Sequence, residues 1–520
     1  MAGPIRIDVF GVIRRILSSG AALTLALLLF APSSPAAKST HELIEALAAD
    51  QGVALNDEEV AVLRRAVPIV GRRYLRQLDL TPLLKKTMSG LREYDTAMAD
   101  ARKQAAANNA GAGAGAGAEA GAEAGAPARP VATYRRVALA LNKGLNVLDA
   151  HSAYLDPESY SELRIRISGK FAGLGLEVTM DEGLVKVIAP IDDTPAQRAG
   201  MRAGDKISHV DGTPIKGMTL REAVSRMRGL VGTTIRLRVV RPKVDDPFEV
   251  LIVRDTIRVP AVRHTVEKDY GYIRISGFSQ RTEAGLRKAM GRIQAALGGN
   301  SLGLVLDLRN NPGGLLRQAI RVSDVFLDQG TIVSVRGRLE EDNEVFRARN
   351  GDLAAGRNIV VLVNEGTASA AEIVAGALKE NDRAIIVGNR SFGKGSVQTI
   401  FSMGDSGALR LTTALYYTPS GRTIQAWGIL PHLLIEHDRQ EAGRREEQLK
   451  GALSRGKGMP PAIGPRAALT GERCNELLAE KIEDQARACA VALLRVGGLD
   501  RLIHLAASLA DDGGTATQKQ

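Results

Sequence analysis

An apolar run that ends in a turn and passes directly into a helix restricts the fold more than any other segment. Residues 359–364 read IVVLVN, which has the length and Val/Ile content of a strand buried in a parallel sheet. Residues 370–379 then predict a helix, with Ser369 at the turn. A hydroxyl there could attack a carbonyl while free amides at the positive helix end receive the developing oxyanion. Taken alone, the position is more typical of a helix N-cap.

A lysine follows the next short apolar run, residues 384–387. Lys394 lies between Gly393 and Gly395, so other backbone can approach it closely. Lysine acts as a base only if burial lowers its pKa from about 10.4. A Ser–Lys pair is one known alternative to Ser–His–Asp. An ordinary surface lysine in a loop would show the same local sequence.

A third strand-like run, residues 302–308, leads into Pro312-Gly313-Gly314. Pro-Gly-Gly before a helix leaves backbone amides free and would supply a second oxyanion donor. A purely structural turn would have the same sequence.

Short strands and turns dominate residues 169–253. In the run GLGLEV at 173–178, glycines at alternate positions let successive N–H groups point at one spot, a nest that captures a C-terminal carboxylate. A predicted helix at 220–228 and an alternating segment at 234–241, typical of an edge strand, follow. Residues 168–243 resemble a PDZ domain. The resemblance implies that amides around Leu174, Gly175 and Leu176 bind a peptide's C-terminal end.

The N-terminal part predicts export and then helices. Arginines at 6, 14 and 15 precede an apolar run at 20–30 and small residues up to Ala37, the layout of a cleaved signal peptide spanning residues 1–37. The sequence therefore predicts a mature chain outside the cytoplasm, in a periplasm, without a stable membrane span. Helical periodicity fills most of 38–165, interrupted by an Ala/Gly-rich insertion at 105–128.

Composition excludes several function classes. The net charge is +11, yet only 4% of residues are aromatic and no long Lys/Arg run occurs, which argues against nucleic-acid binding. The seven histidines show no H-x-x-x-H spacing, so a zinc hydrolase is unsupported.

Taken together, these segments resemble the carboxy-terminal processing peptidases, or tail-specific proteases, which are Ser–Lys endopeptidases with an inserted PDZ domain. The motifs that carry the resemblance are ordered along the chain: 149–155 (DAHSAYL), 271–275 (GYIRI), 307–314 (DLRNNPGG), 367–372 (TASAAE), 393–398 (GKGSVQ) and 417–425 (YTPSGRTIQ). The implied fold is a multidomain α/β protein. Its parts are a helical N-terminal region (38–165), the PDZ domain (166–245), a crotonase/Clp-like α/β protease core (246–435) and a linker with a helical C-terminal segment (436–520).

The resemblance also implies roles for individual residues. Ser369 would be the nucleophile, Lys394 the general base, and Gln398 would orient the lysine. The amides of Ala370 and of Gly313 or Gly314 would form the oxyanion hole, and Arg228 would couple peptide binding to assembly of the site. No metal or cofactor is implied.

The implied partners are proteins with free C-terminal ends, further copies of the chain bound through the terminal helices, and an adaptor protein. The alternative is a non-catalytic periplasmic peptide-binding or scaffold protein that uses only the PDZ domain. Two departures from the family pattern affect local geometry: His432 follows Pro431 where aspartate is common, and Ala150 replaces a proline.

The chain has two cysteines, Cys474 and Cys489, and residues 475–488 contain no Gly or Pro, as expected of one continuous helix. Over fifteen residues such a helix would separate the two Cα atoms by about 22 Å, far beyond bridging distance. The sequence therefore favours two free thiols. A bridge, which export would favour, requires a turn near Lys481.

Overall fold

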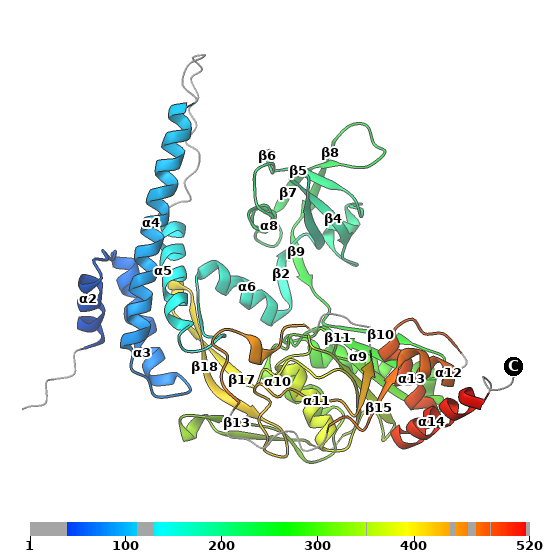
Figure 1. The fold of residues 1–520 in the computed structure, drawn as a ribbon. Coiled ribbons are helices and arrows are strands. Elements are labelled where there is room, and N and C mark those ends of the chain that lie inside the picture. Colours follow the sequence, from blue (N-terminus) through cyan, green and yellow to red (C-terminus); the bar gives the residue numbers. More distant parts are fainter. Residues whose placement is uncertain are drawn as a thin grey trace, which may run out of the picture.

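The computed structural model describes residues 39–111, 129–349, 351–436, 443–455, 464–478 and 480–515. The predicted signal peptide and residues 112–128 of the predicted insertion lie outside these ranges. None of the helices within them has the length and apolar character needed to cross a bilayer. Figure 1 shows an N-terminal group of helices, a separate small β domain and a large α/β core.

A seven-stranded sheet forms the centre of the core, in the order β10-β11-β12-β15-β16-β19-β20. Only β10 and β11 pair antiparallel, and every later pair is parallel. The strands are β10 (Val262–Val266), β11 (Gly271–Ile275), β12 (Gly303–Asp307), β15 (Asn358–Val363), β16 (Ile385–Gly388), β19 (Leu433–Glu436) and β20 (Ala467–Thr470). The predicted buried strand at 359–364 is therefore confirmed as β15, in the middle of the sheet.

Helices cover both faces of this sheet. The first face carries α9 (Thr282–Leu297), α10 (Leu316–Asp324) and α11 (Ala370–Glu380); the second carries α12 (Gly471–Leu478), α13 (Gln485–Val496) and α14 (Leu499–Thr515). Along β15, Val361 packs with the first set, whereas Val360 and Leu362 pack with the second, as strand periodicity requires. The predicted C-terminal helical segment thus completes the core (Figure 1).

The expectation of one C-terminal helix with two free thiols is wrong, because Cys474 and Cys489 form a disulfide with their Cα atoms 4.9 Å apart. α12 ends at Leu478 and α13 begins at Gln485. The chain turns between them because the Asn475 side chain accepts from the backbone N–H of Ile482 (2.9 Å) and donates to its carbonyl (3.1 Å). Short-range side-chain bonding therefore ends the helix without Gly or Pro.

Replacing both cysteines by serine is expected to lower the free energy of unfolding by about 3 kcal/mol, since the bridge closes a loop of about 15 residues in the unfolded chain. Urea denaturation of the parent and the double variant measures the difference. The reduced parent should then match the variant. Two titratable thiols in the denatured, unreduced parent would contradict the bridge itself.

A second sheet joins the core to the N-terminal helices. Its strands are β1 (Ala153–Leu155), β13 (Thr331–Gly337), β14 (Glu344–Arg347), β17 (Ser396–Ser402) and β18 (Ala408–Tyr417). The helices are α2 (Thr40–Asp50), α3 (Asp57–Arg73), α4 (Thr81–Gly111) and α5 (Arg129–Leu145), which confirms the predicted helical region. Leu409 and Leu411 of β18 are fully buried among side chains of these helices.

The small β domain has its own core and the predicted PDZ-like order of elements. Its strands are β3 (Leu176–Asp181), β4 (Leu184–Pro190), β5 (Lys206–Val210), β6 (Thr213–Pro214), β7 (Thr234–Val240) and β8 (Phe248–Val253), with helices α7 (Pro195–Arg198) and α8 (Leu220–Met227). The prediction of β7 as an edge strand is wrong: β7 lies between β5 and β8, because β8 adds a further antiparallel pair. β3 and β8 are the edges.

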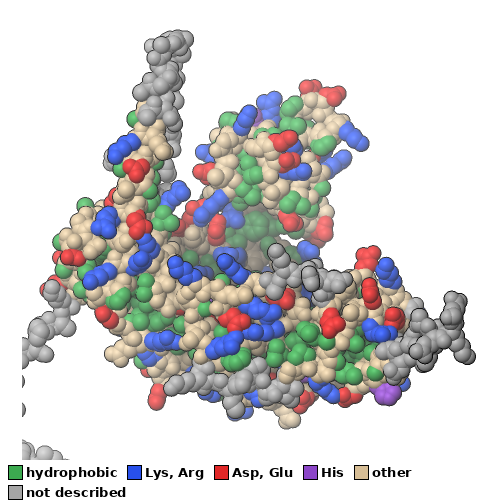
Figure 2. Space-filling view, viewed as in Figure 1, with side chains coloured by type: hydrophobic (Ala, Val, Ile, Leu, Met, Phe, Trp, Pro, Cys, Tyr) green, Lys and Arg blue, Asp and Glu red, His purple; other side chains and the backbone are tan. Residues whose placement is uncertain are grey.

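Helix α6 (Pro157–Ser168) and the two-stranded ribbon of β2 (Lys170–Gly173) and β9 (Asp255–Arg258) connect this domain to the rest of the chain. It therefore stands away from the core in Figure 1, and Figure 2 shows the surface hollowed between them. On the face shown in Figure 2, Lys and Arg side chains are interspersed with Asp and Glu.

Candidate active site

Ser369 occupies the turn between β15 and α11 in an unusual backbone conformation. Its φ of 56° and ψ of −116° lie in a region that non-glycine residues rarely adopt, at a cost of about 1–3 kcal/mol. Ser369 is the N-cap of α11 and forms a capping box with Glu372. Its N–H donates to Glu372 Oε2 at 2.7 Å. The N-cap that the sequence suggests is therefore present, but capping does not require this rare backbone conformation.

Two backbone amides near Ser369 have no acceptor within the described part of the chain, those of Ala370 and Gly314. The N–H of Gly313 is occupied, because it donates to Asn311 Oδ1 at 2.9 Å. A Cβ on Gly313 would lie 2.8 Å from Ser369 Cβ. Of the two predicted glycines, Gly314 thus offers the free amide, while Gly313 allows the loop to approach the serine.

The loop that carries Lys394 connects β16 to β17 and contacts the Ser369 turn through Glu372. The N–H groups of Gly393 and Lys394 donate to the Glu372 carboxylate at 2.7 and 2.9 Å. A Cβ on Gly395 would come within 2.3 Å of the backbone nitrogen of Gln425. The predicted close backbone approach beside the lysine is confirmed.

The Lys394 side chain lies in a low-dielectric environment between mixed charges. Burial, with a smaller contribution from the positive charge of Arg410, lowers its pKa to about 8, and the carboxylates of Glu446, Asp149 and Glu372 oppose the shift. Its Nζ donates no hydrogen bond to any described residue. Gln398, predicted to orient it, instead donates to Ser396 Oγ at 2.9 Å and Thr412 Oγ1 at 3.3 Å.

Glu372 received no role from the sequence, although it connects the two loops. It is fully buried and accepts four hydrogen bonds, from the N–H groups of Ser369, Gly393 and Lys394 and, at 2.5 Å, from the Ser391 hydroxyl. Burial raises its pKa to about 7 against the effect of these donors. The Ser-x-x-Glu spacing from Ser369 is that of a capping box, a signal that would have identified the residue.

Further polar residues around Lys394 were also missed. His151 Nε2 lies 2.8 Å from Glu446, whose carboxylate also accepts from Gln425 Nε2 at 2.9 Å. The Tyr416 hydroxyl lies close to the Ser369 side chain; burial raises its pKa to about 12, and the hydrogen bond with Ser369 opposes that rise. Glu446 lies in the stretch interpreted as a charged linker, where no sequence pattern marks it.

The departure at His432 has a structural explanation. Its Nδ1 accepts the backbone N–H of Ile386 at 3.0 Å, which requires a neutral ring. Burial lowers the pKa of His432 to about 4, and the positive charges of Lys379 and Arg466 act in the same direction. The histidine therefore connects the segment before β19 to β16.

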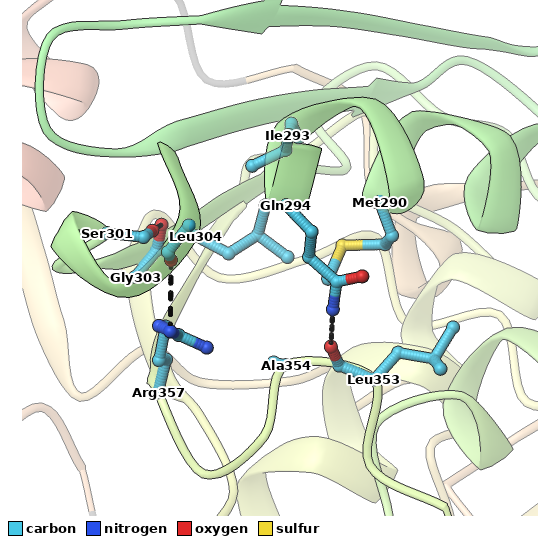
Figure 3. A pocket seen from close by; sticks show the side chains of 10 residues that line it. Met290, Ile293, Gln294, Ser301, Gly303, Leu304, Leu353, Ala354 and Arg357 are labelled. Atoms are coloured by element: carbon cyan, nitrogen blue, oxygen red, sulfur yellow. Dashed lines mark hydrogen bonds between the residues drawn. The ribbon is translucent and has the colours of Figure 1, made fainter. Parts of the chain in front are cut away.

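Two cavities elsewhere in the described chain do not contain the predicted site residues. One lies between α9 and residues 353–357 (Figure 3) and has about 20 Å³, room for one water molecule. Its polar groups are satisfied, since Gln294 donates to Leu353 O and Arg357 to Gly298 O. The other, about 370 Å³, lies among the N-terminal helices, where Arg136 pairs with Glu59 and Asp95. No three His, Cys, Asp or Glu residues among those described are grouped to hold a metal ion.

The predicted peptide-binding segment lies directly before the edge strand β3. Gly175 has φ +83°, and the N–H groups of Leu174 and Gly175 have no acceptor among the described residues. A Cβ on Gly175 would lie 2.2 Å from Thr194 Cβ, so only glycine fits. Arg228, at the end of α8, places its guanidinium 5.7 Å from the centre of the Phe171 ring on β2.

Comparison with known proteins identifies two domains and several similar proteases. Residues 269–435 match peptidase family S41, and residues 186–241 match the PDZ domain. A carboxy-terminal-processing protease of Bartonella bacilliformis is 54% identical over 298 residues, covering 57% of this chain and 69% of that protein. A carboxyl-terminal-processing protease of Picosynechococcus sp. is 36% identical, covering 60% and 75%. Among solved structures, the photosystem II D1 C-terminal processing protease is 28% identical with a TM-score of 0.40, covering 73% of this chain and 93% of that one.

Proposed function

Because the chain belongs to the carboxy-terminal processing proteases, serine-type endopeptidases of family S41, we propose that it cleaves exported proteins at or near their C-terminal ends through a Ser–Lys acyl-enzyme. One observation carries the proposal: the buried Glu372 carboxylate accepts backbone N–H groups from both Ser369 and Lys394. The backbone of the proposed nucleophile and that of the proposed base are therefore both hydrogen-bonded to the Glu372 carboxylate.

The proposed reaction uses only side chains and amides of this chain. Neutral Lys394 takes the proton of the Ser369 hydroxyl as the oxygen attacks the scissile carbonyl. The free amides of Ala370 and Gly314 receive the oxyanion. The protonated lysine then gives its proton to the leaving amine, and water, activated by the neutral lysine, hydrolyses the ester. The Lys394–Ser369 hydrogen bond would form when substrate completes the site, since such contacts are often absent from free enzymes.

A serine-reactive fluorophosphonate probe tests the proposal directly. The purified chain should cleave casein and should be labelled stoichiometrically, with the label on the peptide containing Ser369. Labelling that abolishes cleavage supports the acyl-enzyme mechanism. Casein cleavage without labelling of Ser369 would refute it, and peptide binding with neither activity would favour a non-catalytic binding protein.

We further propose that the PDZ domain engages the substrate's C-terminal carboxylate with the amides of Leu174, Gly175 and Leu176. The free N–H groups of the first two support this role, as does the free edge of β3, which can pair with an extended peptide. Arg228 would transmit binding to the core, because its partner ring, Phe171, lies on the ribbon that connects the two domains.

Gly175→Ala is expected to weaken binding of a C-terminal peptide at least about tenfold, because the added Cβ collides with Thr194 and displaces the amides. Fluorescence anisotropy of a labelled peptide measures the change. Gly212→Ala is the matched control, since Gly212 has a similar φ of +79° with nothing within 4 Å of its Cβ position. An equal loss of peptide affinity in both variants would show a general effect of backbone strain at positive φ. Unchanged affinity in Gly175→Ala would exclude this peptide site.

Export and assembly complete the proposal. The basic, apolar and small residues up to Ala37 support cleavage of a signal peptide and activity in a periplasm. The terminal helices would mediate homo-oligomerisation, and an adaptor protein would deliver substrates. Amino-terminal sequencing of the chain purified from a periplasmic fraction tests the first point: a start at 37 or 38 is expected, and an intact residue 1 would contradict it.

A further inference from the structure

The loop that supplies the Gly314 amide starts from a buried cluster of charges. Asp307, the last residue of β12, is fully buried and accepts from the Tyr272 hydroxyl at 2.6 Å and from Arg274 at 2.9 Å. Arg309 folds back to the same carboxylate, with its Nε at 3.0 Å and its terminal nitrogen at 2.7 Å. Its backbone N–H donates there as well, at 2.9 Å.

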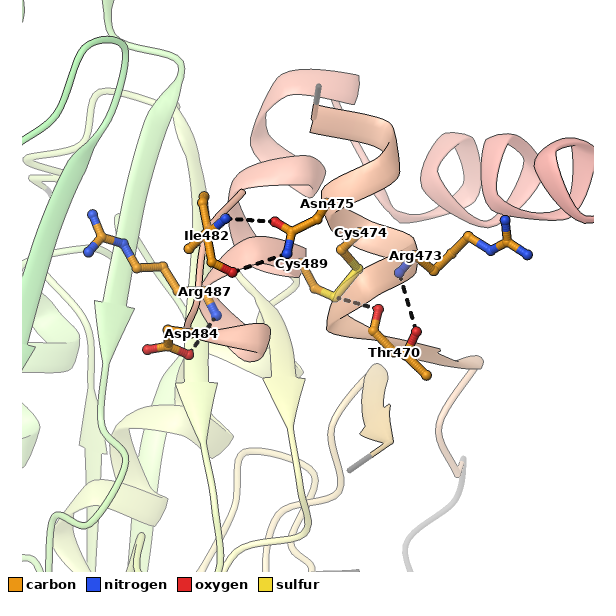
Figure 4. The surroundings of a disulfide bond; sticks show 8 residues. All are labelled: Thr470, Arg473, Cys474, Asn475, Ile482, Asp484, Arg487 and Cys489. Carbon is orange, nitrogen blue, oxygen red and sulfur yellow. Dashed lines mark hydrogen bonds between the residues drawn. A yellow bond between two sulfur atoms is a disulfide. The ribbon is translucent and has the colours of Figure 1, made fainter. Parts of the chain in front are cut away.

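Asp484 holds the outer side of the same guanidinium. The two terminal nitrogens of Arg309 donate to its two carboxylate oxygens at 2.7 and 2.6 Å, a bidentate geometry. Asp484 is also the N-cap of α13 and accepts the N–H of Arg487 at 3.1 Å. Figure 4 shows Asp484 at the start of this helix, beside Arg487, with the disulfide farther along.

Covalent and polar bonds fix the position of this aspartate. Cys489 of α13 is bonded to Cys474 of α12, and Asn475 holds both backbone groups of Ile482, two residues before Asp484 (Figure 4). The turn that carries Asp484 therefore moves with the helices that cover the second face of the sheet.

A short stretch, held by hydrogen bonds, separates Arg309 from Gly314, whose amide is the proposed oxyanion donor. Asn310, with φ 54°, donates its N–H to Asn364 Oδ1 at 2.8 Å. Asn311 is fully buried; it donates to Ile275 O at 2.8 Å and accepts from the N–H of Gly313. A rotation of Arg309 would therefore displace these hydrogen-bonded residues and, with them, the amide of Gly314.

We infer that Asp484 is a positioning residue for catalysis: by holding Arg309 it sets the Gly314 amide at the distance the oxyanion requires. The inference rests on the proposed function, because it assigns that amide to the oxyanion hole. It makes the disulfide-bonded C-terminal helices part of the support of the active site, although they lie across the sheet from α11.

Asp484→Asn tests the inference in the full-length mature protein, because asparagine keeps an N-cap oxygen while losing the charge and one acceptor. The matched control is Asp269→Asn, which breaks a different ion pair between α13 and the core, Arg495 to Asp269 at 2.9 Å. Asp484→Asn should lower kcat about tenfold with little change in KM, since small misplacements at a reacting centre cost one to two orders of magnitude. Hydrogen exchange in residues 308–315 should accelerate in this variant alone.

Three results would overturn the inference. One is an unchanged kcat in Asp484→Asn beside an active parent. Another is an equal loss in Asp269→Asn, which would mean that loosening α13 in general is responsible. The third is a parent that neither cleaves casein nor reacts with the fluorophosphonate probe, which would refute the proposed function and the inference with it. The first two results would refute the inference alone, and the first would do so even if hydrogen exchange accelerates.

Discussion

Replacing Ser369 with alanine is expected to lower the rate of protein cleavage by at least about 10⁴-fold, because no acyl-enzyme can form without the hydroxyl. The fold should persist, since Ser369 anchors the turn through its backbone N–H to Glu372, a hydrogen bond that alanine keeps. Cleavage of casein followed over hours, with matched circular dichroism spectra, measures the loss.

Ser276→Ala is the control for this substitution, because Ser276 is an exposed serine of the same core. It should cleave like the parent. Binding of a C-terminal peptide should be equal in the parent and in Ser369→Ala, since the proposed peptide site lies in the PDZ domain. If Ser369→Ala cleaves casein at the parent's rate, Ser369 is not the nucleophile and the Ser–Lys mechanism fails.

The sequence predicts the elements of the core well because their periodicities are strong. The apolar run at 359–364 became β15, and the helix predicted at 370–379 is α11. Predictions failed where one neighbour or one side-chain bond decides the structure. β7 alternates like an edge strand, yet β8 covers its free side. Residues 475–488 contain no helix-breaking Gly or Pro, yet the chain turns between α12 and α13. The hydrogen bonds of Asn475 to Ile482 hold this turn and allow the disulfide that one continuous helix would exclude.

The sequence likewise predicts some residues of the candidate site and misses others. Ser369, Lys394 and Gly314 were visible because each lies at a strand end beside glycine or a helix start, where exposed amides and close approach follow from local sequence. Glu372 is one helical turn from Ser369, and its contacts with the Lys394 loop depend on how two distant turns pack. Glu446 and Asp484 act across even longer separations in sequence, through ion pairs and hydrogen bonds that no periodicity encodes.

The cleavage rate should rise with pH through about 8, the value to which burial lowers the pKa of Lys394. Because the lysine must be neutral to take the Ser369 proton, its active fraction grows with pH, about tenfold per unit well below that pKa. Lys394→Ala should lower kcat by about 10²–10⁴-fold and remove this rising limb. Lys394→Arg should be equally inactive, since a guanidinium stays charged at these pH values. The measurement is kcat/KM against pH from 6 to 10 with a fluorogenic peptide.

Lys379→Met supplies the matched control, because Lys379 is another half-buried lysine whose pKa burial lowers, yet its Nζ donates to Leu430 O at 2.7 Å, away from the Ser369 hydroxyl. Its pH profile should keep the parent's midpoint even if the variant is less stable. A rising limb near pH 8 that survives in Lys394→Ala would assign the titration to another group, of which Glu372, with its pKa near 7, is the first to test. If Lys379→Met changes the rising limb of the pH profile as much as Lys394→Ala does, the limb reflects the stability of the core. The assignment of Lys394 as the general base would then fail.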